Sequence, residues 1–144
     1  MAKVLYTANA LVTGGREKGH GRTADGELEV DLRMPKEMGG SGGGTNPEEL
    51  FAVGYAACFE SALGGVARHR KVDVGEVTIN SSVGMLPTGD GGFKLTVALD
   101  VGTLSGVDDT VAAELVHGAH EVCPYSNATR GNIDVALLLA GKPI

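Results

Sequence analysis

The longest helical segment of the sequence is residues 47–69, which read PEELFAVGYAACFESALGGVARH. Asn46 can cap this helix, Pro47 fits its first turn, and the two acidic residues that follow are favoured at its positive end. Between residues 50 and 63 the segment is apolar over most of its circumference, which is typical of a helix buried from several sides. We therefore expect a central helix against which the rest of the chain packs.

Period-two alternation and turn residues predict strands on both sides of this helix. Residues 14–26 have the character of a polar, glycine-bearing connection, and PTGDGG at 87–92 is a strong hairpin signal. The expected order is strand, strand, helix, strand, strand, helix, strand. The strands cover residues 3–13, 28–33, 72–85, 93–102 and 133–139, and the second helix covers residues 110–122. This order indicates an α+β fold and one domain over residues 1–144.

Composition narrows the classes of function. The net charge of −6 argues against nucleic acid and against an anionic membrane as partners. No apolar run approaches the roughly 20 residues that span a bilayer, and no export signal is recognisable at the N-terminus. We therefore expect a cytoplasmic protein, in which thiols stay reduced unless chemistry oxidises them.

Cys58 and Cys123 are the only cysteines, and each lies in an apolar setting. Two such thiols are either a redox couple or two inert core residues. Burial in a helix would raise the pKa of Cys58 and favour the neutral thiol, so a reactive Cys58 needs a nearby cation. A neighbouring arginine can lower such a pKa by roughly 1–3 units, enough to make thiolate the main form.

Several segments together resemble the organic hydroperoxide resistance proteins, the Ohr branch of the Ohr/OsmC family. The resemblance covers nearly the whole chain and is most specific in the run that contains Cys123. The matching segments are KVLYT (3–7), TGGR (13–16), TNPE (45–48), LFA (50–52), GY (54–55), ACF (57–59) and VCPYSNATRGNIDV (122–135).

The resemblance implies a cysteine-based peroxidase without haem, flavin, metal or other cofactor. By position, Cys58 matches the peroxidatic cysteine and Cys123 the resolving cysteine of the family. Arg16 matches the arginine that stabilises the thiolate, and Glu48 matches the acid that holds this arginine. Glu49 could pair with Arg16 in principle, but the family pattern favours Glu48.

The implied substrates are alkyl and fatty-acid hydroperoxides, and the implied reductant is a lipoyl-type dithiol carried on a protein. Cys58 would become a sulfenic acid, and Cys123 would condense with it to a disulfide that a dithiol reopens. Apolar walls suit such substrates better than hydrogen peroxide, and Phe51, Phe59 and Leu63 could supply them. The family fold is a set of antiparallel sheets wrapped around buried central helices in an intertwined homodimer.

Helix geometry bears on that dimer. Glu48 and Cys58 are ten residues apart, or about 15 Å along a straight helix. One guanidinium cannot touch both on the same chain. We therefore expect Arg16 and Glu48 of one subunit to serve Cys58 of the other.

Other interpretations stay open beside this one. The same superfamily contains osmotically inducible OsmC-type proteins with broader peroxide use, and a non-catalytic redox-sensing or binding module would keep both thiols without fast turnover. The glycine run at 39–44 lacks the Gly-Lys-Ser/Thr ending of a phosphate loop and favours a lid or a dimer contact. His117, His120 and Cys123 fan over about 120° of a helix, which disfavours a metal site.

Overall fold

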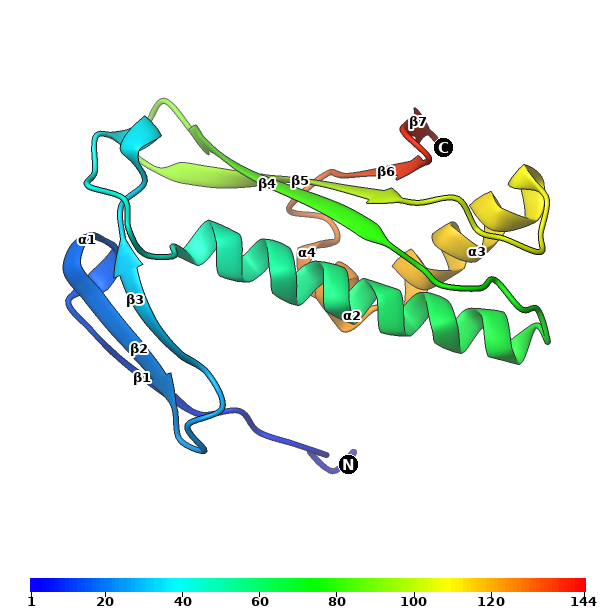
Figure 1. Cartoon of the computed structure of the whole chain (residues 1–144), viewed down its shortest axis with the longest axis horizontal. Helices are drawn as coiled ribbons and strands as arrows, with labels where there is room; N and C mark the ends of the chain where they lie inside the picture. Colours follow the sequence, from blue (N-terminus) through cyan, green and yellow to red (C-terminus); the bar gives the residue numbers. More distant parts are fainter. The chain divides into compact units, whose positions relative to one another are not determined.

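The computed structural model describes residues 1–144, which form two compact units, Met1–Leu50 and Phe51–Ile144. The boundary falls inside the long helix α2 (Pro47–His69), whose bounds agree with the sequence prediction. Whether the two units make one domain stays a prediction. Figure 1 labels the elements of both units.

The first unit contains a three-stranded antiparallel sheet in the order β1-β2-β3. Its elements are β1 (Ala10–Thr13), α1 (Gly15–Lys18), β2 (Gly19–Thr23), β3 (Glu29–Arg33) and the short 3-10 helix η1 (Lys36–Met38). The first strand is shorter than predicted, because regular pairing begins only at Ala10.

Strand β2 and helix α1 lie where we expected an irregular connection. The two buried positions of β2 are Gly19 and Gly21, so the strand has no apolar alternation to recognise in the sequence. A methyl group added at Gly21 would meet Val12 and Val30 of the neighbouring strands at 3.4 and 3.7 Å. These are ordinary van der Waals distances, so a Cβ at Gly21 would lie in contact with the valines of β1 and β3.

The second unit contains a four-stranded sheet and three helical segments. After the rest of α2 come the hairpin strands β4 (Ile79–Pro87) and β5 (Phe93–Val101), helices α3 (Asp109–Val122) and α4 (Pro124–Thr129), and strands β6 (Val135–Leu139) and β7 (Lys142–Pro143). The predicted hairpin is confirmed, and β4 starts later than expected because residues 72–78 form no strand.

The second sheet corrects the expectation of antiparallel sheets, because β5 and β6 pair in parallel. The chain leaves the end of β5, passes through α3 and α4, and returns to the start of β6. Such a helical crossover makes the two strands it joins parallel. The sheet is therefore mixed, and the α+β class stands.

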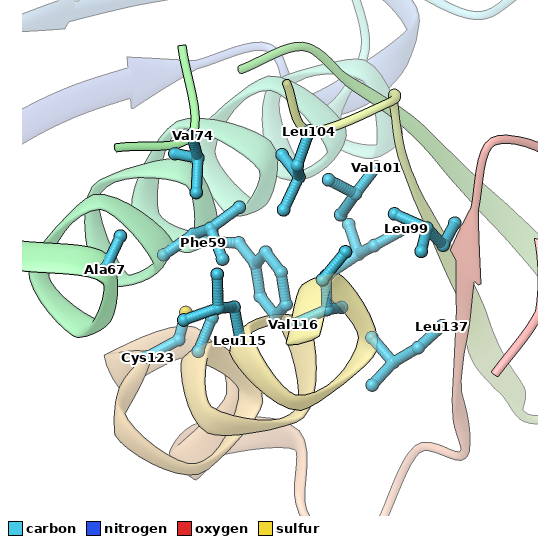
Figure 2. Packing of buried hydrophobic residues seen from close by; sticks show 14 of the residues in the cluster. Phe59, Ala67, Val74, Leu99, Val101, Leu104, Leu115, Val116, Cys123 and Leu137 are labelled. Atoms are coloured by element: carbon cyan, nitrogen blue, oxygen red, sulfur yellow. The ribbon is translucent and has the colours of Figure 1, made fainter. Parts of the chain in front are cut away.

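The core of the second unit is built on one stripe of α2. Tyr55, Phe59, Leu63 and Ala67 recur every four residues and are buried, so they face one side of the helix. They pack against buried residues of β5, α3 and β6, and Figure 2 shows Phe59, Leu115, Val116 and Leu99 gathered in this cluster.

Within the single chain only this side of α2 is buried, since Val53 on the same helix is 72% exposed. Burial of α2 on several sides stays a prediction. By length and hydropathy α2 could also cross a membrane, against our expectation that no segment is long enough. The core helix of a globular protein passes the same test, and the buried stripe gives α2 that structural role.

Candidate active site

The two cysteines lie beside one another in the second unit. Cys58 is half-buried on α2, next to the core residue Phe59, and Cys123 is fully buried. The Cys123 thiol donates a hydrogen bond to the Cys58 sulfur, with 3.5 Å between the two Sγ atoms. A disulfide needs about 2.05 Å between the sulfurs, so the pair is reduced and requires only a small approach to close.

Cys123 lies at the junction between α3 and α4. Its backbone is extended (φ −63°, ψ 126°), which ends α3 and begins α4. Pro124 occupies the first position of α4, where its missing N–H costs nothing. Pro124 therefore follows the end of α3 and begins α4.

The groups of the second unit favour the neutral form of Cys58. Burial raises the pKa of this thiol, and the neighbouring Cys123 raises it further. A hydrogen bond from the backbone amide of Tyr125 acts in the opposite direction. A reactive thiolate at Cys58 therefore needs positive charge from outside these groups.

Arg16 and Glu48 form the corresponding pair in the first unit. Nη1 and Nη2 of Arg16 each donate a hydrogen bond of 3.1 Å to a different carboxylate oxygen of Glu48. This two-point contact fixes the plane of the guanidinium as well as its position. It raises the pKa of Arg16 and lowers the pKa of Glu48, so both groups stay charged.

The cap of α2 explains why Glu48, and not Glu49, takes Arg16. Asn46 accepts a hydrogen bond from the backbone N–H of Glu49 and donates one to its carboxylate, at 2.9 and 3.1 Å. The Thr45 hydroxyl donates to the other carboxylate oxygen of Glu49. Glu49 is thus held by the capping residues, which leaves Glu48 for the arginine.

Of the three predicted pocket residues, only Phe51 lies at the edge of the core. Its ring centroid is 5.9 Å from that of Tyr55 and 5.9 Å from that of Tyr125. Phe59 and Leu63 are fully buried in the core, which gives them a packing role. That they also line a substrate pocket stays a prediction.

Sequence reasoning missed the contribution of Tyr55 and of the first turn of α4. The Tyr55 hydroxyl is buried and bonds to Ser126 at 2.9 Å and to Thr129 at 3.1 Å. The Tyr125 ring lies over Gly54, where an added methyl would meet its hydroxyl at 2.9 Å. One signal was available: a tyrosine on a buried helix stripe must find a polar partner.

Comparison with known proteins identifies the family of the chain. The family model described as OsmC-like protein matches residues 40–137. An organic hydroperoxide resistance protein of Xanthomonas axonopodis pv. citri is 54% identical over 142 residues and covers 96% of each chain. The organic hydroperoxide resistance protein OhrB of Bacillus subtilis is 47% identical over 136 residues, 94% of this chain and 98% of that protein.

A solved structure shows the same fold. The crystal structure of an organic hydroperoxide resistance protein from Legionella pneumophila superposes with a TM-score of 0.91 at 53% identity, covering 96% of this chain and 99% of that one. The chain belongs to the OsmC-like family. Within that family it is a member of the organic hydroperoxide resistance branch, as the resemblance implied.

The Arg16–Glu48 pair makes a prediction about stability at acid pH. Because the pKa of Glu48 is lowered by folding, the stabilisation is present above the unfolded pKa, about 4.3, and is lost as pH falls through the lower folded value. Glu48→Gln lacks this titration. Its free energy of unfolding should therefore fall less steeply than that of the wild type between about pH 5 and pH 3. The difference between the two proteins should be less than about 1 kcal/mol, because Arg16 is partly exposed.

Urea denaturation at a series of pH values measures this slope. Glu76→Gln is the matched control, since Glu76 is exposed and belongs to no ion pair, and it should keep the wild-type slope. Equal slopes for Glu48→Gln and the wild type would show that the pair does not contribute to stability.

Proposed function

We propose that this protein is a thiol peroxidase that reduces organic hydroperoxides to alcohols. The observation that carries the proposal is the 3.5 Å separation of Cys58 and Cys123 in a chain of the organic hydroperoxide resistance branch. Two thiols at this distance can pass through a sulfenic acid to a disulfide without rearrangement of the core. Defence against oxidative stress follows from this activity and agrees with the names of the relatives.

The reaction divides into three balanced steps. The Cys58 thiolate attacks the terminal peroxide oxygen of ROOH, the O–O bond breaks, and RO⁻ leaves and takes a proton to become ROH. The resulting Cys58 sulfenic acid condenses with the Cys123 thiol, which forms the S–S bond and releases water. An external dithiol then reduces the disulfide by exchange and is itself oxidised. The family resemblance favours a protein-bound lipoyl dithiol as this reductant.

Arg16 is the cation that the Cys58 thiolate requires. The groups around Cys58 raise its pKa, and the guanidinium fixed by Glu48 can reverse this effect. Its remaining N–H donors can also stabilise the charge that develops on the leaving oxygen of the peroxide.

The arginine comes from a second copy of the chain. Glu48 and Cys58 lie on the same continuous helix, separated by ten residues and about 15 Å of rise. A guanidinium held by Glu48 is too far from Cys58 of its own helix. We therefore assign Arg16 and Glu48 of one subunit to Cys58 of the other, in a homodimer with two sites.

Exposed apolar residues support a dimer. Leu32 is the only hydrophobic residue of the first unit that is buried, whereas Leu11, Val12 and Leu28 of its sheet region are exposed. The N-terminal arm before β1 forms no strand and exposes Val4, Leu5 and Tyr6. Surfaces of this kind are expected to be covered in an obligate oligomer.

Apolar hydroperoxides fit the surroundings of Cys58 best. Phe51 and Tyr125 form an aromatic cluster with Tyr55 on the side of α2 that bears the thiol. An alkyl chain gains from contact with such rings, whereas hydrogen peroxide has no apolar part to bury. A cytoplasmic location suits a dithiol that must be reduced again after each turnover.

The disulfide is the first product to measure. One equivalent of an alkyl hydroperoxide added to the reduced protein should remove two hydrogens from the intact mass, and a peptide map should link Cys58 to Cys123. Cys58→Ser should show no change, because the attacking thiolate is absent. Cys123→Ser should still consume peroxide but proceed to the sulfinic acid when peroxide is in excess. An unchanged mass of the wild-type protein would refute the peroxidase proposal.

The origin of Arg16 is tested by mixing two inactive variants. Arg16→Ala and Cys58→Ser subunits are refolded together, and peroxide reduction is measured with a lipoyl dithiol. Random pairing makes about half of the molecules heterodimers, each with one complete site, so about one quarter of the wild-type activity should return. If Arg16 served its own chain, the mixture would show only the average of the two parents.

A further inference from the structure

A network of buried hydroxyl groups joins α2 and α4 close to the two cysteines and takes no part in the proposed peroxidase steps. Tyr55 and Ser126 are fully buried and Thr129 is 4% exposed. Tyr55 precedes Cys58 by three residues and Ser126 follows Cys123 by three residues. Their hydroxyls meet at 2.9 Å, so the bond crosses between α2 and α4 one helical turn from the sulfur pair.

The network continues to the end of α3. Nδ1 of His120 lies 2.8 Å from the Ser126 hydroxyl, and Thr129 bonds both to the Tyr55 hydroxyl and to the backbone carbonyl of Ser126. On the outside, Arg130 donates to the backbone carbonyl of His120 at 2.7 Å. The three helices that surround the sulfur pair are thereby tied to one another through polar groups.

A count of protons indicates the direction of these bonds. Four contacts connect His120, Ser126, Tyr55, Thr129 and the Ser126 carbonyl, but the three hydroxyls supply only three protons. Every contact has its own donor if Nδ1–H of the imidazole donates to Ser126, Ser126 to Tyr55, Tyr55 to Thr129, and Thr129 to the carbonyl. Nδ1 donates in both the neutral Nδ1–H form and the protonated form of histidine, so the chain of bonds holds in either.

We infer that Tyr55 and Ser126 are positioning residues for the closure of the disulfide. Their bond holds the first turn of α4 against α2, where the Tyr125 ring also packs on Gly54. With this turn fixed, the two sulfurs stay 3.5 Å apart and need little ordering to react. Without it, the turn that follows Cys123 gains freedom in the reduced protein, and this freedom must be lost again when the disulfide forms.

The inference rests on the proposed function for its biological meaning. The closure of the Cys58–Cys123 disulfide can nevertheless be measured without peroxide. In that step the two thiols lose two electrons and two protons to oxidised dithiothreitol, which becomes the dithiol while the Cys58–Cys123 bond forms. The equilibrium constant of this exchange reports how well the folded protein presents one sulfur to the other.

The test compares Ser126→Ala and Tyr55→Phe with the wild type in buffers of reduced and oxidised dithiothreitol, quantified by alkylation and intact mass. Both variants should disfavour the disulfide by about tenfold, which is about 30 mV for this two-electron couple. Ser81→Ala is the matched control, since the Ser81 hydroxyl is buried in the same unit but has no hydrogen-bond partner. It should leave the constant unchanged.

Free energies of unfolding measured on the same proteins separate a general loss of stability from loss of positioning. A lower stability with an unchanged exchange constant would overturn the inference. An equal change of the exchange constant in Ser81→Ala would also overturn the inference. If Ser126→Ala does not fold, Tyr55→Phe carries the test alone, because it keeps the ring and removes only the hydroxyl. Failure of the wild type to react with alkyl hydroperoxide would refute the peroxidase proposal and leave this result standing.

Discussion

The burial of one stripe of α2 is the constraint on which the site depends. Once Phe59 and Leu63 face the core, the helix has no rotational freedom left, and Cys58 must lie at the edge of the buried stripe. At this edge the thiol is near enough to the core to meet Cys123 and exposed enough for a small molecule to reach it. The geometry of the sulfur pair is thus a consequence of core packing.

The same burial creates an electrostatic problem. A thiol in apolar surroundings favours its neutral form, and a neutral thiol is a poor nucleophile. We propose that the Arg16 guanidinium, which Glu48 holds at two points, supplies the positive charge that a Cys58 thiolate needs. At the start of α2, Glu49 bonds to the capping residues Thr45 and Asn46. Glu48 has no bond to these residues and can therefore hold the guanidinium of Arg16.

Much of this fold could be predicted from the sequence, and the exceptions have physical reasons. The bounds of α2 followed from its cap and its apolar run, and the β4–β5 hairpin followed from its turn residues. Strand β2 was not predicted because its two buried positions are glycines, which leave no apolar alternation in the sequence. The parallel pairing of β5 with β6 depends on the path of α3 and α4 between the two strands. A local sequence pattern does not predict such a path. Of the site, the two cysteines were noted because they are the only ones in the sequence, and the Arg16–Glu48 pair was expected from the family resemblance. The bond between Tyr55 and Ser126 joins residues 71 positions apart, so no sign of it was visible in the sequence.

The central claim is that positive charge from Arg16 overcomes the burial of Cys58, and the pKa of this thiol tests it most directly. The rate of alkylation of Cys58 is measured against pH in Cys123→Ser protein, with and without Arg16→Ala. The account predicts a pKa below the ordinary value of about 8.5 when Arg16 is present and a rise of about one to three pH units when it is removed. A pKa above the ordinary value in both proteins would contradict it, because Cys58 would then be an inert core thiol.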